Sequence, residues 1–283
     1  MTTEARSVDR MSVEEELEKA EASELARYRG IGGFWAVVFA AMVAAAVILA
    51  VNQMFNLGFF VGFVLIDNRY LYLMVGLLFP LVFMVFPPFK GSPLDRVPWY
   101  DAVLAVLTFV VAMYFVWNSN AILDEAWEYV APETAVYVSL LMWVLLIEIG
   151  RRTGGIAIFI ITVVISLFPT YADMVPNIIS GVPQTLGDTA AFHMMSVESL
   201  LGIPMRAFGT LVFGFLIFGA ALQYTGAGAF FINFAFALLG HVRGGPAKVA
   251  IFASGLMGSM SGSVVTNVIT TGAMSIPAMK RIG

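Results

Sequence analysis

Six apolar stretches constrain this chain more than any other feature of its sequence. A helix needs roughly 20 mostly apolar residues to cross the hydrocarbon core of a bilayer. Of the 283 residues, 60% are hydrophobic and only 12% are charged, whereas a soluble domain carries about 25% charged residues. Because backbone groups in lipid are satisfied only within helices or closed barrels, we predict an all-α, polytopic transmembrane protein. The stretches lie at residues 31–51, 70–86, 99–117, 134–150, 155–171 and 209–224.

The composition also excludes several classes of function. The chain has no cysteine, so disulfides, thiolate metal sites and cysteine nucleophiles are absent from it. With only two histidines, His193 and His241, a zinc site built on imidazole is disfavoured. The net charge of -4 indicates no nucleic-acid partner.

The basic residues alternate along the connections between stretches. The tail at residues 1–30, predicted to contain a solvated helix, carries five Lys or Arg residues, and the connections after the second and fourth stretches carry two each. The remaining connections carry at most one. Under the positive-inside rule this pattern predicts a cytoplasmic N-terminus. The same rule predicts that residues 226–240 form a helix along the cytoplasmic interface.

Two acidic residues lie in or beside the apolar stretches. Glu148 precedes Arg151 and Arg152 by about one helical turn, which favours an interfacial ion pair over a role in coupling. Asp101 lies near the start of the third stretch, where we expect it to be hydrated.

The last forty residues carry most of the functional information. Residues 246–257 form an apolar arm of about 18 Å if helical, too short to span a bilayer. A Gly- and Ser-rich segment at 258–263 and a second short arm at 264–274 follow, with basic residues on both flanks. We therefore predict a re-entrant helical hairpin at residues 245–277, entered from the cytoplasm.

An unwound turn at membrane depth must face protein or a water-filled cavity. Its free carbonyls and hydroxyls can replace the hydration shell of Na⁺, and the N-terminus of the second arm can receive an anion. Thr266 and Asn267, one turn into the second arm, add hydroxyl and amide oxygens. The alternative is a small-residue motif that only lets two helices approach closely.

Two other functions compete with this interpretation. An intramembrane serine hydrolase would use Ser259 or Ser261, but a serine nucleophile needs a base within hydrogen-bond reach. We expect His193 in an external loop and His241 at the cytoplasmic flank, so neither reaches the hairpin. The other alternative is a structural scaffold subunit with no substrate site of its own.

The C-terminal third resembles a known family, the large membrane subunit of the TRAP (tripartite ATP-independent periplasmic) transporters. The earlier stretches resemble a fused small four-helix subunit. This fused form, with an asparagine at position 267, is most similar to the TAXI-associated branch of the family. The matching motifs are Gly202-Ile203-Pro204, Phe218-Gly219-Ala220, Gly226-Ala227-Gly228, Gly240-His241-Val242-Arg243-Gly244-Gly245-Pro246-Ala247, Ala253-Ser254-Gly255, Ser261-Gly262-Ser263 and Ile276-Pro277-Ala278-Met279-Lys280-Arg281.

The resemblance implies a secondary transporter of the bacterial inner membrane rather than an enzyme. It implies Na⁺-coupled import of organic acids such as carboxylates, an elevator mechanism and a separate periplasmic substrate-binding protein of the TAXI type. Na⁺ is then the coupling ion, and no cofactor is implied. The motif match implies that the tip of the first hairpin binds Na⁺ and substrate, and Thr266 is added because its hydroxyl lies one turn into the second arm. The residues of this site are Gly258, Ser259, Ser261, Gly262, Ser263, Thr266 and Asn267. Those implied to hold the Na⁺ itself are Ser261, Gly262, Ser263 and Asn267.

The resemblance also divides the chain. We predict a cytoplasmic tail at 1–30, a small-subunit-like domain at 31–150 and the start of a large-subunit-like transport domain at 151–283. Two features depart from the family, Thr266 where Ala is more usual and Asn267 where other branches often have Asp. The family's large subunit continues beyond position 283, so we expect the second hairpin outside this sequence.

Overall fold

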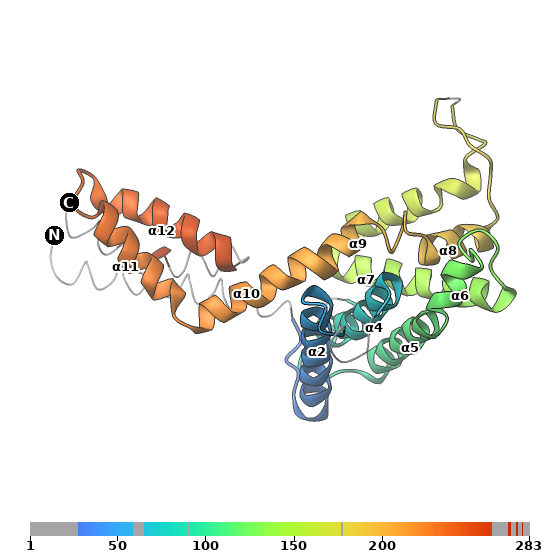
Figure 1. Cartoon of the computed structure of the whole chain (residues 1–283), viewed down its shortest axis with the longest axis horizontal. Helices are drawn as coiled ribbons and strands as arrows, with labels where there is room; N and C mark the ends of the chain where they lie inside the picture. The colour runs from blue at the N-terminus through green and yellow to red at the C-terminus, as the bar shows by residue number, and fades with distance from the viewer. Residues whose placement is uncertain are drawn as a thin grey trace. The chain divides into compact units, whose positions relative to one another are not determined.

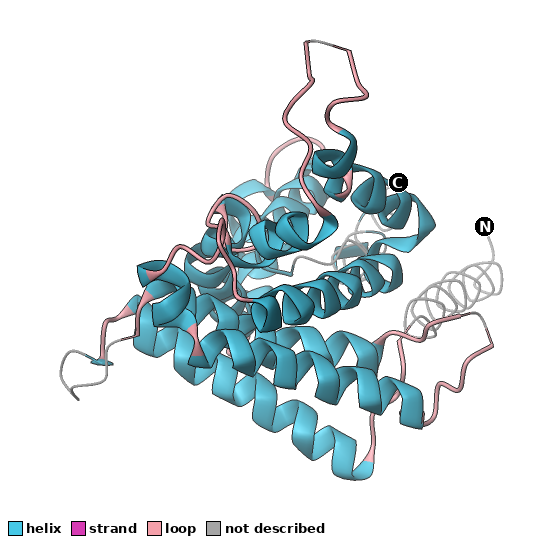
Figure 2. Ribbon diagram, turned by 90° about the vertical axis from the view of Figure 1, so that its right-hand side faces the viewer, coloured by secondary structure: helices cyan, strands magenta, loops and turns pink. Residues whose placement is uncertain are grey.

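The computed structural model describes residues 28–58, 65–89, 91–176, 178–261, 271, 272, 276 and 279. Throughout these residues the regular structure is helical and no strand occurs (Figure 2). Among the described residues, five helices are long and apolar enough to cross a membrane. The prediction of an all-α, polytopic membrane protein is therefore confirmed. The predicted N-terminal helix lies outside the described residues.

The chain divides into two compact units. One contains Arg27–Gly214, and the other contains Met1–Ala26 together with Phe215–Gly283. The predicted boundary between residues 150 and 151 separates parts that resemble two different subunits. The division into compact units does not test that resemblance, so this boundary stays a prediction.

The first three predicted spans are confirmed as α2 (Gly33–Met54), α4 (Asp67–Val85) and α5 (Trp99–Trp117). Helices α4 and α5 lie side by side (Figure 1). They approach closely at Gly76, where a Cβ atom would lie 2.6 Å from the Met113 Cε atom. Helix α4 ends at Val85 because the Pro87 and Pro88 that follow have no N–H to continue it.

The fourth and fifth stretches are continuous in α7 (Glu133–Ser166), after the short α6 (Ser119–Asp124). Gly155 interrupts α7 with φ 76° and ψ −172°, a left-handed region that favours glycine. A straight helix would hold Trp143 and Ser166 about 34 Å apart, yet both contact His193. The chain therefore reverses at Gly155, which confirms the predicted tight turn.

The connection after the fifth stretch is more ordered than predicted. It contains the 3₁₀ turn η1 (Phe168–Tyr171) and the helix α8 (Leu186–Met195). The Thr185 hydroxyl caps α8 by accepting a hydrogen bond from the Asp188 N–H at 3.1 Å. His193 thus lies in a helix, so its predicted place in a loop is wrong, because a capping residue starts a helix that hydropathy did not indicate. Its predicted external side stays a prediction.

The sixth span begins earlier than predicted. It comprises α9 (Ile203–Ala207), the π-helical segment η2 (Phe208–Val212) and α10 (Phe213–Tyr224), of which Ile203–Leu222 is long enough to cross a membrane. The Tyr70 hydroxyl donates to the Gly209 carbonyl at 2.6 Å. The π-helical turn therefore coincides with a carbonyl that a neighbouring helix uses.

In the second unit, α11 (Ala227–Leu239) and α12 (Gly245–Ser261) form a helical hairpin. Gly226 and Gly244, with φ 85° and 73°, begin the two helices. The helices share a small buried core, which consists of Ile232, Ala235, Val249 and Ala253. Residues 226–240 are therefore helical as predicted, and their place along an interface stays a prediction.

Candidate functional site

The predicted ion site begins within α12. Gly258, Ser259 and Ser261 are helical, so the first arm of the hairpin has 17 residues instead of about a dozen, a length of about 26 Å. The predicted unwinding at Gly258 is wrong, because packing continues as far as the buried Met257 and the Ser259 hydroxyl donates within the helix to the Leu256 carbonyl at 2.7 Å. That bond leaves the oxygen lone pairs of Ser259 free to accept or to coordinate.

The rest of the predicted ion site, Gly262, Ser263, Thr266 and Asn267, lies outside the described residues. Residues 271 and 272 of the predicted second arm are helical, as are residues 276 and 279 beyond it. The ligand set therefore stays a prediction.

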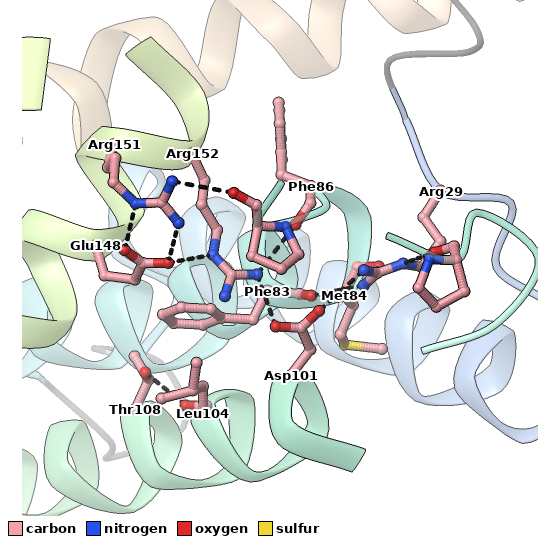
Figure 3. Close-up of polar contacts among 12 residues, drawn as sticks. Arg29, Phe83, Met84, Phe86, Asp101, Leu104, Thr108, Glu148, Arg151 and Arg152 are labelled. Carbon is pink, nitrogen blue, oxygen red and sulfur yellow. Dashed lines mark hydrogen bonds and ion pairs between the residues drawn. The ribbon is translucent and has the colours of Figure 1, made fainter. Parts of the chain in front are cut away.

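A cluster of charged residues in the first unit was predicted only in part, since the sequence interpretation found the ion pairs of Glu148 but not the burial of Asp101 between Arg29 and Arg152 (Figure 3). We call it the Asp101 cluster, and its members are Arg29, Asp101, Glu148, Arg151 and Arg152. Asp101 is fully buried, so its predicted hydration is wrong. Two guanidinium groups replace water around it, since Asp101 Oδ2 accepts from Arg29 Nη2 at 2.9 Å and Oδ1 accepts from Arg152 Nη1 at 2.8 Å.

Arg29 ties the segment before α2 to the end of α4. Its backbone N–H donates to the Val85 carbonyl at 2.8 Å. Its side chain donates to the carbonyls of Phe83 and Met84 at 3.1 and 3.2 Å and to that of Pro93 at 3.0 Å. The last carbonyls of a helix have no partner within it, and here a buried cation supplies one at the negative end of the α4 dipole.

Arg152 and Arg151 continue the Asp101 cluster into α7. Arg152 donates to Glu148 Oε1 at 2.7 Å and to the Phe86 carbonyl at 3.1 Å, and its guanidinium lies 4.8 Å from the centre of the Phe83 ring. Arg151 binds both oxygens of Glu148 at 2.7 Å. The predicted ion pairing of Glu148 is confirmed.

The Asp101 cluster joins four parts of the first unit. Three guanidinium groups face two carboxylates, and the main-chain carbonyls around them accept the remaining donors. Breaking a buried pair on one side costs about 3–5 kcal/mol, because the other charge is left without compensation. The arrangement is suited to holding helices together, since its charges are already engaged with one another.

Both ring nitrogens of His193 lie within hydrogen-bond distance of neighbouring groups. Its Nε2 lies 2.8 Å from the Ser166 carbonyl oxygen and its Nδ1 lies 3.0 Å from the Ser199 hydroxyl. The ring borders a mostly apolar hollow of about 440 Å³ between the two halves of α7 and α8. Over the described part of the chain, no group of three or more His, Asp or Glu residues is placed to hold a metal ion.

Comparison with known proteins identifies the family. The profile of the tripartite ATP-independent periplasmic transporter, DctM component, matches residues 141–283, which is 143 of 283 residues. The chain belongs to the DctM family. The match contains the end of the Asp101 cluster on α7 as well as α12 and every predicted ion-site residue.

One similar protein of the DctM family is the sialic acid TRAP transporter permease protein SiaT of Haemophilus influenzae (strain 86-028NP). It is 28% identical over 150 residues, which cover 53% of this chain and 21% of SiaT. The chain thus spans about a fifth of this relative's length. No solved structure matches. Membership of the DctM family indicates a component of a membrane transporter rather than an enzyme.

Proposed function

We propose that this chain is the membrane permease component of a Na⁺-coupled importer of organic acids that works with a periplasmic substrate-binding protein. The observation that supports this most is the DctM profile over residues 141–283, because it spans all the residues predicted to bind Na⁺ and substrate. The relative from Haemophilus influenzae is named for an acid, which is consistent with an organic acid as substrate.

We further propose the details that the motifs imply. The permease is a fusion of small-subunit-like and large-subunit-like parts, its partner is of the TAXI type, and transport follows an elevator mechanism. The basic residues on both flanks of residues 245–277 support a re-entrant hairpin, because they favour entry and exit on the same side of the membrane. Na⁺ is held near the tip by hydroxyl, amide and carbonyl oxygens, the hard ligands that such a cation prefers.

The test is uptake into proteoliposomes by the complete permease with its binding protein. An inward Na⁺ gradient should drive accumulation of a labelled carboxylate, and a K⁺ gradient of the same size should not. Uptake that does not depend on the Na⁺ gradient would contradict the proposed coupling to Na⁺.

Site variants then test the ligand set. Ser263→Ala and Asn267→Ala should raise the Na⁺ concentration for half-maximal uptake by about tenfold, the effect of losing roughly 1.4 kcal/mol of ligand interaction. Ser196→Ala is a suitable control because Ser196 is buried but lies on the connection after α8. An equal effect of Ser196→Ala would indicate general destabilisation instead of lost ligands.

The first unit carries a second proposed role, as a scaffold. The Asp101 cluster favours this role because it joins the segment before α2 to α4, α5 and α7 through buried ion pairs. A rigid first unit should show the same distances between spin labels on α4 and α7 with and without Na⁺ and substrate. A change of several ångströms between these conditions would contradict a static scaffold.

A further inference from the structure

Arg69 lies in the first turn of α4, at the opposite end of that helix from the Asp101 cluster. Its Nε donates to the Ser119 hydroxyl at 2.8 Å, and the Ser119 side chain is fully buried. This bond holds one edge of the guanidinium against the start of α6. Within the described ranges, neither terminal nitrogen of Arg69 has a hydrogen-bond or ion-pair partner.

Among the described residues no carboxylate forms an ion pair with Arg69, and two acidic residues, one near it in the chain and one directly after α6, are engaged with other groups. Asp67 Oδ1 accepts from Gln53 Nε2 at 3.3 Å, and Glu125 Oε2 accepts from the Trp127 indole N–H at 2.8 Å. Arg69 is half-buried, so part of its hydration is lost as well. A cation in this situation is best stabilised by an external anion.

A hollow of about 400 Å³ lies next to Arg69. We call it the Arg69 hollow, and the described residues that line it are Arg69, Val116 and Trp117. This described part of the lining is part cationic and part apolar. Such a surface fits a ligand that is itself anionic at one point and apolar beside it.

The position of Trp117 indicates where this hollow lies. Trp117 is the last residue of α5, a helix of 19 residues that can cross a membrane, and its side chain is 87% exposed. Tryptophan at the end of a span prefers the interface, at the level of lipid headgroups. The Arg69 hollow is therefore at the depth of the phosphate groups.

We propose that Arg69, Ser119 and Trp117 form a binding site for the phosphodiester of a phospholipid headgroup. The two free terminal nitrogens of Arg69 present a planar pair of donors that matches two phosphate oxygens. Ser119 fixes the guanidinium through Nε, and the Trp117 ring borders the glycerol and upper acyl region. The ligand is a lipid because the phosphate and the apolar wall are recognised together.

The experiment measures lipid retention by the purified protein. Native mass spectrometry of the detergent-solubilised protein, titrated with phosphatidylglycerol, gives the dissociation constant. Arg69→Gln should weaken binding by about tenfold or more, the effect expected when a paired charge-assisted contact is lost. Arg96→Gln, which removes an exposed arginine from the connection between α4 and α5, should leave it unchanged.

Two milder variants test the same site while keeping a positive charge at position 69. Arg69→Lys keeps the charge but loses the planar pair of donors, so binding should weaken by less than in Arg69→Gln. Ser119→Ala keeps the guanidinium but frees its Nε edge, and should also weaken binding to an intermediate degree. Equal binding by all three variants and the wild type would overturn the proposal.

The choice of ligands separates a lipid from other anions. Diacylglycerol, which has the acyl chains but no phosphate, should bind no better to the wild type than to Arg69→Gln. Inorganic phosphate at millimolar concentration should not displace phosphatidylglycerol; displacement would identify a site for free anions instead. If Arg69→Gln reduces affinity for the periplasmic binding protein while lipid retention is unchanged, the residue is a protein contact and the proposal fails.

Discussion

The two ends of the α4–α5 pair use arginine in opposite ways. At one end, Arg29 and Arg152 are buried and share the Asp101 carboxylate. At the other end, about 21 Å along α4 from Phe83, Arg69 is half-buried with one hydroxyl partner and two free donors. The first end is satisfied within the protein, whereas the second is prepared for a partner from outside. The same residue type therefore supports cohesion at one membrane interface and binding at the other.

The strongest test of this contrast is Asp101→Ala. It leaves Arg29 and Arg152 buried with no carboxylate between them, so the free energy of unfolding should fall by about 3–5 kcal/mol. Unfolding of the purified protein in detergent, followed by tryptophan fluorescence, measures the change. Asp95→Ala, at an exposed position between α4 and α5, should have little effect. Equal stability of the two variants would show that the Asp101 cluster is not what holds this end together.

Replacing arginine by lysine should separate the two ends more finely. Arg152→Lys exchanges a fork that reaches Asp101, Glu148 and the Phe86 carbonyl for a single ammonium, and should cost about 2 kcal/mol. Arg69→Lys loses only the bond to Ser119 and should cost less than about 1 kcal/mol in detergent without added lipid. An equal loss of unfolding free energy in both variants would contradict the proposed difference between the two ends.

Salt should weaken the exposed ion pairs of the Asp101 cluster more than the buried ones. The Glu148 side chain is 26% exposed while that of Asp101 is fully buried. Glu148→Gln should therefore cost about 1 kcal/mol at low ionic strength, and less at about 1 M salt, where the Debye length is about 3 Å. The cost of Asp101→Ala should be nearly independent of salt. A cost for Glu148→Gln that does not change with salt would mean that its pairs are shielded from water.

The smallest expected effect is that of Arg69→Gln on stability. In detergent without added phospholipid its unfolding free energy should stay within about 0.5 kcal/mol of the wild type, because the residue has few internal contacts. Added phosphatidylglycerol should then stabilise the wild type more than the variant, since a ligand stabilises the state that binds it. Identical stabilisation of both proteins would show that the lipid effect does not depend on Arg69, and the proposed contrast between the two ends would be lost.

Much of the helical fold follows from the sequence for a direct physical reason. Residues 99–117 are mostly apolar and have tryptophans at both ends, and they form α5 with the predicted bounds. Lipid leaves the backbone no alternative to a helix over such a stretch. The turn near residue 154 was also predictable, because two apolar stretches with only four residues between them must reverse. The ion pairing of Glu148 followed from helical spacing alone.

The errors share a cause, which is that spacing along the chain does not report distance across the fold. Asp101 has no basic residue within helical spacing, so the sequence offered no reason to expect its burial between two arginines. The length of α12 was underestimated because glycine and serine at 258–261 are typical of turns, yet tolerate a helix when its other face is packed against α11. Helix α8 is short and mixed in polarity, and its only local signal was the capping Thr185.

The amino-acid sequence by itself determined the class of this protein, because its apolar lengths leave lipid as the only solvent and helices as the available backbone. Its motifs determined the family. Only the tertiary structure decided which charges pair between different elements. Burial removes water from Asp101 and makes Arg29 and Arg152 its substitutes, while the same helix pair leaves Arg69 beside an open hollow. Whether a charge is paired depends on which elements meet around it, and in this chain those elements are 50 or more residues apart in sequence.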